Sequence, residues 1–213
     1  KDENITVTSS NAEVVILIDI PLDGNVTQEN FYSYFDESGL LRDEITFDKL
    51  VFNGEFTGLG AGYVVLTKSI EIVGNNAVLK NMGIVISAPD VSVSNFTLNA
   101  DTALGDLVYV GENNVNLTNL DINYNISSDE AGRAISVMDA KNVNVEGANV
   151  YFESHVVDSG VDAVAINIEE AENVFVKDSD IKTSLPALLV NYGAATTMFM
   201  GIDQVNPIRI MGI

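Results

Sequence analysis

The stretch Val91-Ser-Val-Ser-Asn95-Phe-Thr-Leu98 decides the fold, because it places apolar residues at its first, third, sixth and eighth positions. The same frame recurs wholly or in part in six further segments, which start at Ile45, Ile70, Val115, Val143, Val174 and Met198. Residues two apart face the same side of a strand, and the change of step at the centre indicates a bend. Each segment is therefore predicted to form two short strands around a corner.

A third apolar run follows each segment, at residues 63–66, 84–86, 107–110, 134–137, 164–166, 188–190 and 208–211. Three strands per unit and a period of 21 to 31 residues are typical of coils that stack on one another. The predicted fold is all-β: a single-stranded parallel β-helix of about seven coils. It should be right-handed, because crossovers between parallel strands are almost always right-handed. A β-sandwich is the alternative, but it has no reason to repeat one spacing. Three methionines at strand positions are expected to fill the core: Met198, Met200 and Met211.

Residues suited to tight corners flank the predicted strands. Ser69, Asp90, Asn114, Asn142, Asn173 and Thr197 precede the first strand of a unit, and Gly74, Asn95, Asn119, Gly147 and Asp178 stand at the bend. Glycine, asparagine and aspartate tolerate left-handed backbone angles, and the polar pair can also bond to turn amides. Equivalent asparagines of stacked coils are expected to hydrogen-bond to one another in ladders.

The two ends of the chain differ from the repeat. Residues 1–44 are predicted to form an N-terminal cap with a short α-helix near residues 27–36, where Thr27 would be the N-cap and acid would lie in the first turn. Residues 45–213 are the predicted β-helix, expected to be truncated because residues 208–213 still follow a strand pattern. The helix would cover the open end of the solenoid with an aromatic face made of Phe31, Tyr34 and Phe35.

Composition excludes several classes of partner. The chain carries 31 acidic and 10 basic residues, a net charge of -21. This charge repels phosphate backbones and anionic bilayers, so neither nucleic acid nor direct membrane insertion is expected. There is no cysteine to form disulfides or to bind a metal as thiolate. Five Asn-x-Ser/Thr sequons favour an exported protein and are candidate glycosylation sites: Asn4, Asn25, Asn95, Asn116 and Asn125.

Three stretches in the first third of the chain carry a resemblance. They read Phe31-Tyr-Ser-Tyr-Phe-Asp36-Glu-Ser-Gly39-Leu-Leu41, Ile45-Thr-Phe-Asp-Lys-Leu-Val-Phe-Asn-Gly54 and Ile70-Glu-Ile-Val-Gly-Asn-Asn76. Together they resemble the cap and first coils of the large adhesin-like surface proteins of methanogenic archaea, which share the pectate-lyase-like parallel β-helix. The resemblance implies an acidic, exported protein displayed outside the cell, at its surface, with an adhesive role and no settled catalytic motif.

A carbohydrate-active enzyme is the main alternative, because parallel β-helices also include polysaccharide lyases and hydrolases. A lyase needs clustered carboxylates for calcium and a basic side chain for proton abstraction, whereas Arg42, Arg133 and Arg209 are scattered. A hydrolase needs carboxylates facing one groove, whereas Asp178 and Asp180 are interpreted as solvated turn and strand residues. We therefore predict no catalytic residue and no resident cofactor or metal site, although surface carboxylates could hold Ca²⁺.

The units that start at Val115 and Val143 are the longest, at 28 and 31 residues, and their surplus lies in residues 123–132 and 151–162. Because the units are consecutive, the two excursions are expected to emerge side by side. Aromatic rings beside carboxylates suit a sugar, calcium or a protein surface. The candidate ligand-binding residues are Tyr124, Asp129, Glu130, Arg133, Tyr151, Phe152, Glu153, His155, Asp158 and Asp162.

These observations favour a non-catalytic, extracellular adhesion or binding module at the cell surface. Its expected partner is a host-cell surface protein or a glycan, recognised through loops on the β-helix. The alternatives are a polysaccharide lyase or hydrolase, a sugar-binding remnant of such an enzyme, and a structural spacer.

Overall fold

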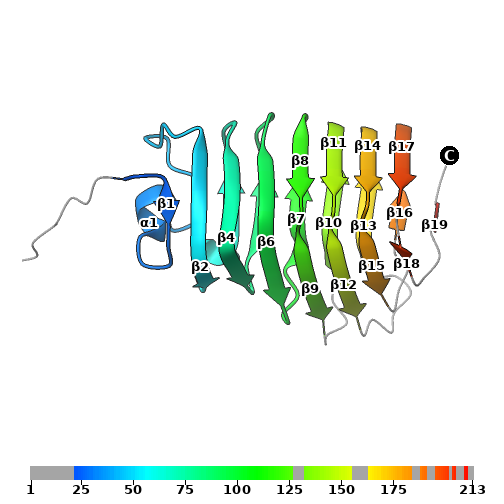
Figure 1. The fold of residues 1–213 in the computed structure, drawn as a ribbon, viewed down its shortest axis with the longest axis horizontal. Coiled ribbons are helices and arrows are strands. Elements are labelled where there is room, and N and C mark those ends of the chain that lie inside the picture. Colours follow the sequence, from blue (N-terminus) through cyan, green and yellow to red (C-terminus); the bar gives the residue numbers. More distant parts are fainter. Residues whose placement is uncertain are drawn as a thin grey trace, which may run out of the picture.

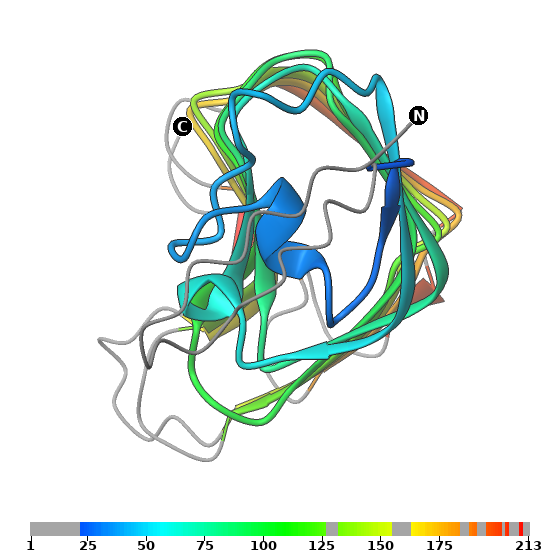
Figure 2. The ribbon, with the colours of Figure 1, turned by 90° about the vertical axis from the view of Figure 1, so that its left-hand side faces the viewer.

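The computed structural model describes residues 22–126, 132–154, 163–183, 188–190, 195–201, 203–204 and 209–210. Its strands pair in parallel and wind into a β-solenoid of about six turns, close to the seven coils predicted (Figure 1). Seen from the N-terminal end, the chain turns clockwise as it recedes, which makes the solenoid right-handed (Figure 2). The predicted fold class is therefore confirmed. None of the described helices has the length and apolar character needed to cross a bilayer.

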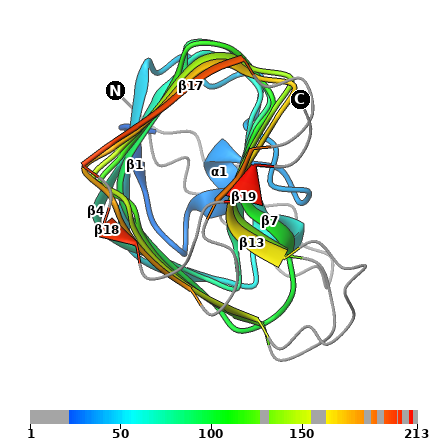
Figure 3. The same ribbon diagram turned by 90° about the vertical axis from the view of Figure 1, so that its right-hand side faces the viewer.

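Two parallel sheets form the walls, and their coils overlie one another when viewed from the C-terminal end (Figure 3). The twelve-stranded sheet contains β1 (Asn25–Val26), β2 (Lys49–Thr57), β4 (Glu71–Lys80), β6 (Ser92–Ala100), β8 (Val115–Thr118), β9 (Asp121–Ile126), β11 (Lys141–Glu146), β12 (Asn149–Ser154), β14 (Glu172–Lys177), β15 (Asp180–Thr183), β17 (Ala195–Met200) and β18 (Asp203–Gln204). The seven-stranded sheet contains β3 (Tyr63–Leu66), β5 (Gly83–Ile86), β7 (Gly105–Val110), β10 (Gly132–Met138), β13 (Ala163–Glu169), β16 (Leu188–Val190) and β19 (Arg209–Ile210). The single 3₁₀ turn of the described chain, η1, spans Gly60–Gly62.

Equivalent residues of neighbouring coils lie above one another, as the repeat predicts. Val143 pairs with Val115, and the backbone N–H of Asn116 donates to the carbonyl oxygen of Val91 at 3.0 Å. The three valines are fully buried. Because every coil adds inward aliphatic side chains at the same places, the hydrophobic core is continuous along the axis.

The first unit is out of phase with the prediction. Leu50, not Phe47, stands opposite Ile72, and β2 begins only at Lys49. The frame that starts at Ile45 is therefore not equivalent to the others. Ile45 is buried all the same, next to the cap, so the apolar residues that mimic the frame belong to the packing of the solenoid's end.

The last unit is shifted by one residue. Thr197 pairs with Val174, so Phe199 rather than Met198 packs against the core. Met198 and Met200 are 44% and 53% exposed, and the prediction that they fill the core is wrong. A one-residue slip sends the whole side-chain set of a strand to the opposite face. Met211 lies outside the described residues.

The corners confirm the predicted asparagine ladder. Asp90, Asn114, Asn142 and Asn173, here called the corner ladder, all have φ between 56° and 60°. Their side chains are joined in series, with Nδ2 to Oδ1 distances of 3.0, 3.0 and 3.1 Å. Each amide donates to the coil before it, and Asn114 and Asn142 also accept from the coil after them, so these corners are tied together along the rod.

Gly74 has a different role from the other corner residues. It is not in the left-handed region, whereas Asn76, in the same bend, has φ of 53°. A Cβ on Gly74 would lie 2.1 Å from the carbonyl oxygen of Asn95. Glycine is needed here because two backbones approach closely, and the extra residue of this coil adopts the left-handed conformation instead.

The cap helix is shorter than predicted. Helix α1 spans Phe31–Tyr34, its N-cap is Asn30 without a side-chain capping bond, and no acid lies in its first turn. Thr27 belongs to the preceding turn, where its backbone N–H donates to Oδ1 of Asn30 at 2.7 Å. That bond closes a turn before the helix, and for this reason the helix begins later than Thr27.

The aromatic face of the cap covers the open end of the solenoid, as expected. Phe31, Tyr34 and Phe35 are fully buried. The rings of Phe31 and Phe35 stack at 4.7 Å, and the ring of Phe35 lies 5.9 Å from that of Phe52 in β2. The cap thereby buries apolar surface that the first coil would otherwise expose.

Candidate functional site

The two long excursions leave and return at neighbouring places on the solenoid. At their start, Ile126 at the end of β9 pairs with Ser154 at the end of β12. At their end, Gly132 of β10 pairs with Ala163 of β13. The excursions predicted at residues 123–132 and 151–162 begin later than expected, because residues 123–126 and 151–154 still belong to β9 and β12. Residues 127–131 and 155–162 lie outside the described residues, together with five of the predicted site residues: Asp129, Glu130, His155, Asp158 and Asp162.

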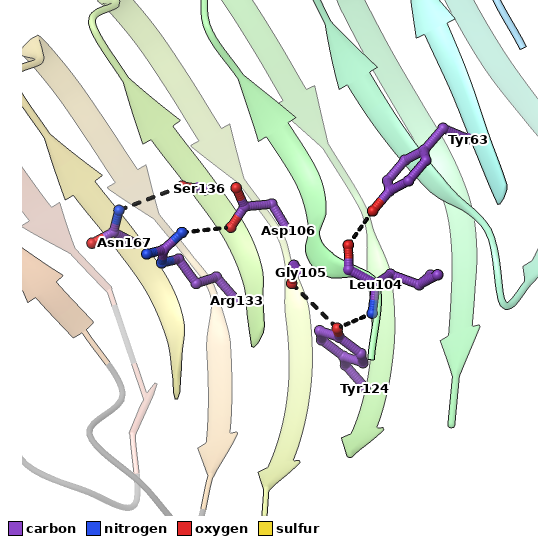
Figure 4. A network of polar contacts seen from close by, with 8 residues as sticks. All are labelled: Tyr63, Leu104, Gly105, Asp106, Tyr124, Arg133, Ser136 and Asn167. Carbon is purple, nitrogen blue, oxygen red and sulfur yellow. Dashed lines mark hydrogen bonds and ion pairs between the residues drawn. The ribbon is translucent and has the colours of Figure 1, made fainter. Parts of the chain in front are cut away.

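Tyr124 and Phe152 are core anchors. Both side chains are fully buried, and their ring centroids are 5.5 Å apart. The Tyr124 hydroxyl accepts a hydrogen bond from the backbone N–H of Leu104 at 2.8 Å and donates to the carbonyl of Gly105 at 3.2 Å (Figure 4). These rings hold a turn in place and do not present a stacking surface to a dissolved ligand.

Arg133 is held by an acid on the neighbouring coil. Its Nη1 donates to Oδ1 of Asp106 at 3.1 Å, and the two side chains are 22% and 20% exposed (Figure 4). Burial raises the pKa of Tyr63 and of Tyr109, and the charge of Asp106 adds to both shifts. Since the guanidinium and the carboxylate neutralise each other, this pair positions strands and is poorly suited to removing a proton from a substrate.

A polar pair missed by the sequence reasoning lies beside this ion pair. Tyr109, Ser136 and Asn167 occupy one register column on three adjacent strands of the seven-stranded sheet. Ser136 and Asn167 are buried, and Nδ2 of Asn167 lies 3.4 Å from Oγ of Ser136 (Figure 4). An amide N–H is a donor and cannot take a proton from a hydroxyl, so this contact does not activate the serine as a nucleophile.

Among the predicted site residues that the structure describes, Tyr151 and Glu153 lie on the outward face of β12. Tyr151 is 45% exposed, and its hydroxyl donates to Oε2 of Glu153 at 2.9 Å. This hydrogen bond, helped by the charge of Glu153, raises the pKa of Tyr151. On the neighbouring strand, Asn123 pairs with Tyr151 and Asn125 pairs with Glu153.

An open groove of about 370 Å³ runs over the outward face of the twelve-stranded sheet next to Tyr151. Its lining is mostly polar: Lys80, Asn81, Asn99, Ala100, Asp101, Asn123 and Asn125. This groove was not predicted, although the sequence carries a signal for it. Lys80, Asn99, Asn123 and Tyr151 each follow the last apolar position of their two-strand segment, so they occupy one column.

Asp178 and Asp180 lie at a corner and on a strand. Asp178 is an exposed corner residue with φ of 48°, and Asp180 pairs with Lys182 at 2.7 Å, which agrees with their interpretation as turn and strand residues. Within the described ranges, no three histidine or acidic side chains come together as a metal site. Of the sequon asparagines, Asn4 lies outside the description and four are exposed, namely Asn25, Asn95, Asn116 and Asn125.

Family models, curated proteins and solved structures were compared with the chain, and none matches it.

Proposed function

We propose that this chain is a non-catalytic binding module that acts in adhesion outside the cell, with a host-cell surface protein or a glycan as its partner. The observation that carries the proposal is the pairing of the excursion ends, Ile126 with Ser154 and Gly132 with Ala163. These pairs bring the two ends of each long connection next to those of the other, and loops on rigid scaffolds are where binding residues gather.

The described side chains near these ends support binding over catalysis. Arg133 is neutralised by Asp106, and the Tyr151 hydroxyl donates to Glu153. The exposed ring of Tyr151 can stack on a ligand, while Glu153 and the neighbouring amides can bond to it. These groups can bind a ligand by stacking and hydrogen bonding, which is what a non-catalytic module requires.

The acidic, sequon-bearing sequence and its resemblance to archaeal adhesin-like proteins support an exported protein that is displayed at the cell surface. A net charge of -21 also keeps such a rod from associating with itself or with anionic lipid. We therefore place the module in the extracellular space, where it meets its partner.

The test is binding of the purified protein to a glycan array and to intact cells. One variant replaces residues 127–131 and 155–162 by short turns, and a second carries Tyr151→Ala. The matched control is Tyr32→Ala, because Tyr32 is 44% exposed but lies in the cap. We expect both site variants to lose binding and the control to keep it.

Two results would overturn the proposal. Cleavage of a polysaccharide that is lost in Asp158→Ala or Asp162→Ala would assign the chain to carbohydrate-active enzymes. Binding that survives removal of both excursions and of the Tyr151 ring would show that this surface is not the binding site and would leave it the role of a structural spacer.

A further inference from the structure

A column with one residue from each successive coil runs through the groove on the twelve-stranded sheet and past its end. Lys80 pairs with Asn99, Asn99 with Asn123, and Asn123 with Tyr151. Neighbouring parallel strands are about 4.8 Å apart, so the column presents one side chain about every 4.8 Å along the rod. That spacing is close to the length of one pyranose unit in an extended sugar chain.

Three of the four asparagines that line this groove have side chains available to a ligand, whereas Oδ1 of Asn81 already accepts from the backbone N–H of Asp101 at 2.9 Å. Within the described part of the chain, the side chains of Asn99, Asn123 and Asn125 form no hydrogen bond, whereas every amide of the corner ladder forms at least one. An asparagine side chain offers two N–H donors and one carbonyl acceptor, which matches a sugar hydroxyl that both donates and accepts. The fold thus uses one set of outward asparagines for its own corners and leaves another set free.

The charges around the groove select a neutral ligand. Nζ of Lys80, the basic residue of the lining, already lies 2.7 Å from Oε2 of Glu55. Asp101 lines the other side, and the chain as a whole carries a net charge of -21. An acidic polysaccharide would be repelled, while the polar but uncharged hydroxyls of a neutral one would not.

Tyr151 lies next to the groove, beyond Asn123. It follows Asn123 in the column, and its ring is 45% exposed. Its hydroxyl is held by Glu153, which limits rotation of the ring. An exposed aromatic face beside free amides suits the apolar C–H face of a pyranose ring.

We propose that this groove binds an extended, neutral oligosaccharide whose axis runs along the rod. Hydroxyls of successive sugar units bond to Asn99, Asn123 and Asn125, and one unit stacks on Tyr151. This inference rests on the proposed binding function and names the ligand class for the part of the surface adjoining the excursions.

The test is calorimetric titration of the full chain with cellohexaose, xylohexaose and mannohexaose, and with a hexamer of galacturonic acid. The protein is produced without attached glycans, because a glycan on Asn125 would occupy the groove. We expect at least one neutral hexasaccharide to bind and the acidic hexamer not to bind. Asn123→Ala and Asn99→Ala should each weaken the affinity about tenfold. Asn116→Ala, an exposed strand asparagine outside the groove, should leave it unchanged.

The outcomes separate this inference from the proposed function. If none of the three neutral sugars binds, or if Asn99→Ala and Asn123→Ala bind like the unchanged protein, the groove is not the glycan site. If the protein still binds cells in that case, the proposed function stands and only the groove inference fails. If the protein binds neither the oligosaccharides nor cells nor the glycan array, both the proposed function and the groove inference are refuted. Thermal unfolding of the variants at the wild-type temperature confirms that the exposed substitutions leave the fold unchanged.

Discussion

Asn142 provides the sharpest test of what holds the coils together at their corners. It lies in the middle of the corner ladder with φ of 58°, and its amide bonds to Asn114 at 3.0 Å and to Asn173 at 3.1 Å. Two separate effects therefore stabilise the fold at this position. One is the tolerance of asparagine for a left-handed backbone, and the other is the pair of ladder bonds.

Two substitutions separate these effects. In Asn142→Gly the left-handed backbone costs nothing, so the loss reflects two exposed hydrogen bonds, about 1–2 kcal/mol of unfolding free energy together. In Asn142→Ala the bonds are lost and a residue with a Cβ must also stay left-handed, at about 1–2 kcal/mol, so we expect a loss of about 2–4 kcal/mol in total. Because glycine gains about 0.4–1 kcal/mol of freedom in the unfolded chain, the alanine variant should be less stable than the glycine variant by up to about 1.6 kcal/mol.

Equilibrium denaturation in urea, followed by circular dichroism, measures both losses. The control is Asn116→Ala, because Asn116 is an exposed strand residue whose side chain forms no hydrogen bond within the described ranges. We expect this control to change the unfolding free energy by less than about 0.5 kcal/mol. If Asn142→Ala is no less stable than the control, or if the glycine variant is less stable than the alanine variant, the reasoning about the corners is refuted.

Three further predictions concern the interior and the surface acids. Gly74→Ala should lower the unfolding free energy by about 1–3 kcal/mol, because the new Cβ would lie 2.1 Å from the backbone oxygen of Asn95. The Asp139 hydrogen bond and charge raise the pKa of Glu170, so the ionised pair opposes folding above that pKa, and the penalty fades as pH falls through it. Glu170→Gln should thus raise the melting temperature at neutral pH but not in acid. Asn167→Leu should raise the unfolding free energy by about 1 kcal/mol, because Oδ1 of the buried Asn167 has no partner within the described ranges.

Each of these has its own control and its own contrary result. Gly54→Ala adds a Cβ in open space but at φ of 87°, so it measures the cost of a left-handed backbone without a clash. A Gly74→Ala variant as stable as the unchanged protein would argue against close backbone approach as the reason for glycine there. A gain in melting temperature for Glu170→Gln that persists in acid would exclude titration of the pair as its origin. If Asn167→Leu destabilises the protein, the contact with Ser136 contributes more than the unpaired oxygen costs.

The course of the coils could be predicted from the sequence because their signals are local and repeated. The step of two in segments such as the one at Val91 reports which side chains face inward, and Asn114 and Asn142 mark corners by their backbone preference. Each coil meets a neighbour built in the same way, so a local pattern is also a tertiary one. The corner ladder was predictable for the same reason.

The ends of the solenoid were harder to predict from the sequence, because a terminal coil has another coil on only one side. Residues around Ile45 imitate the repeat frame but pack against the aromatic cap, and register with β4 begins only at Lys49. At Met198, a pattern that keeps only part of the frame could not fix the phase of the strand, and pairing with β14 shifted it by one residue. The predicted helix start near Thr27 was too early. The side chain of Asn30 accepts a hydrogen bond from the backbone N–H of Thr27 and closes a turn there, and the helix begins only after that turn.

The alternation of side chains along each strand, and therefore the inward set, was determined by the sequence alone, because it depends only on neighbouring residues. The tertiary structure decided which outward side chains from different coils stand together. Asn99, Asn123 and Tyr151 form one column only because the coils stack in a particular register. Arg133 meets Asp106 for the same reason. That register depends on the length of every corner and on how the core closes between coils, and no single segment of the sequence carries this information.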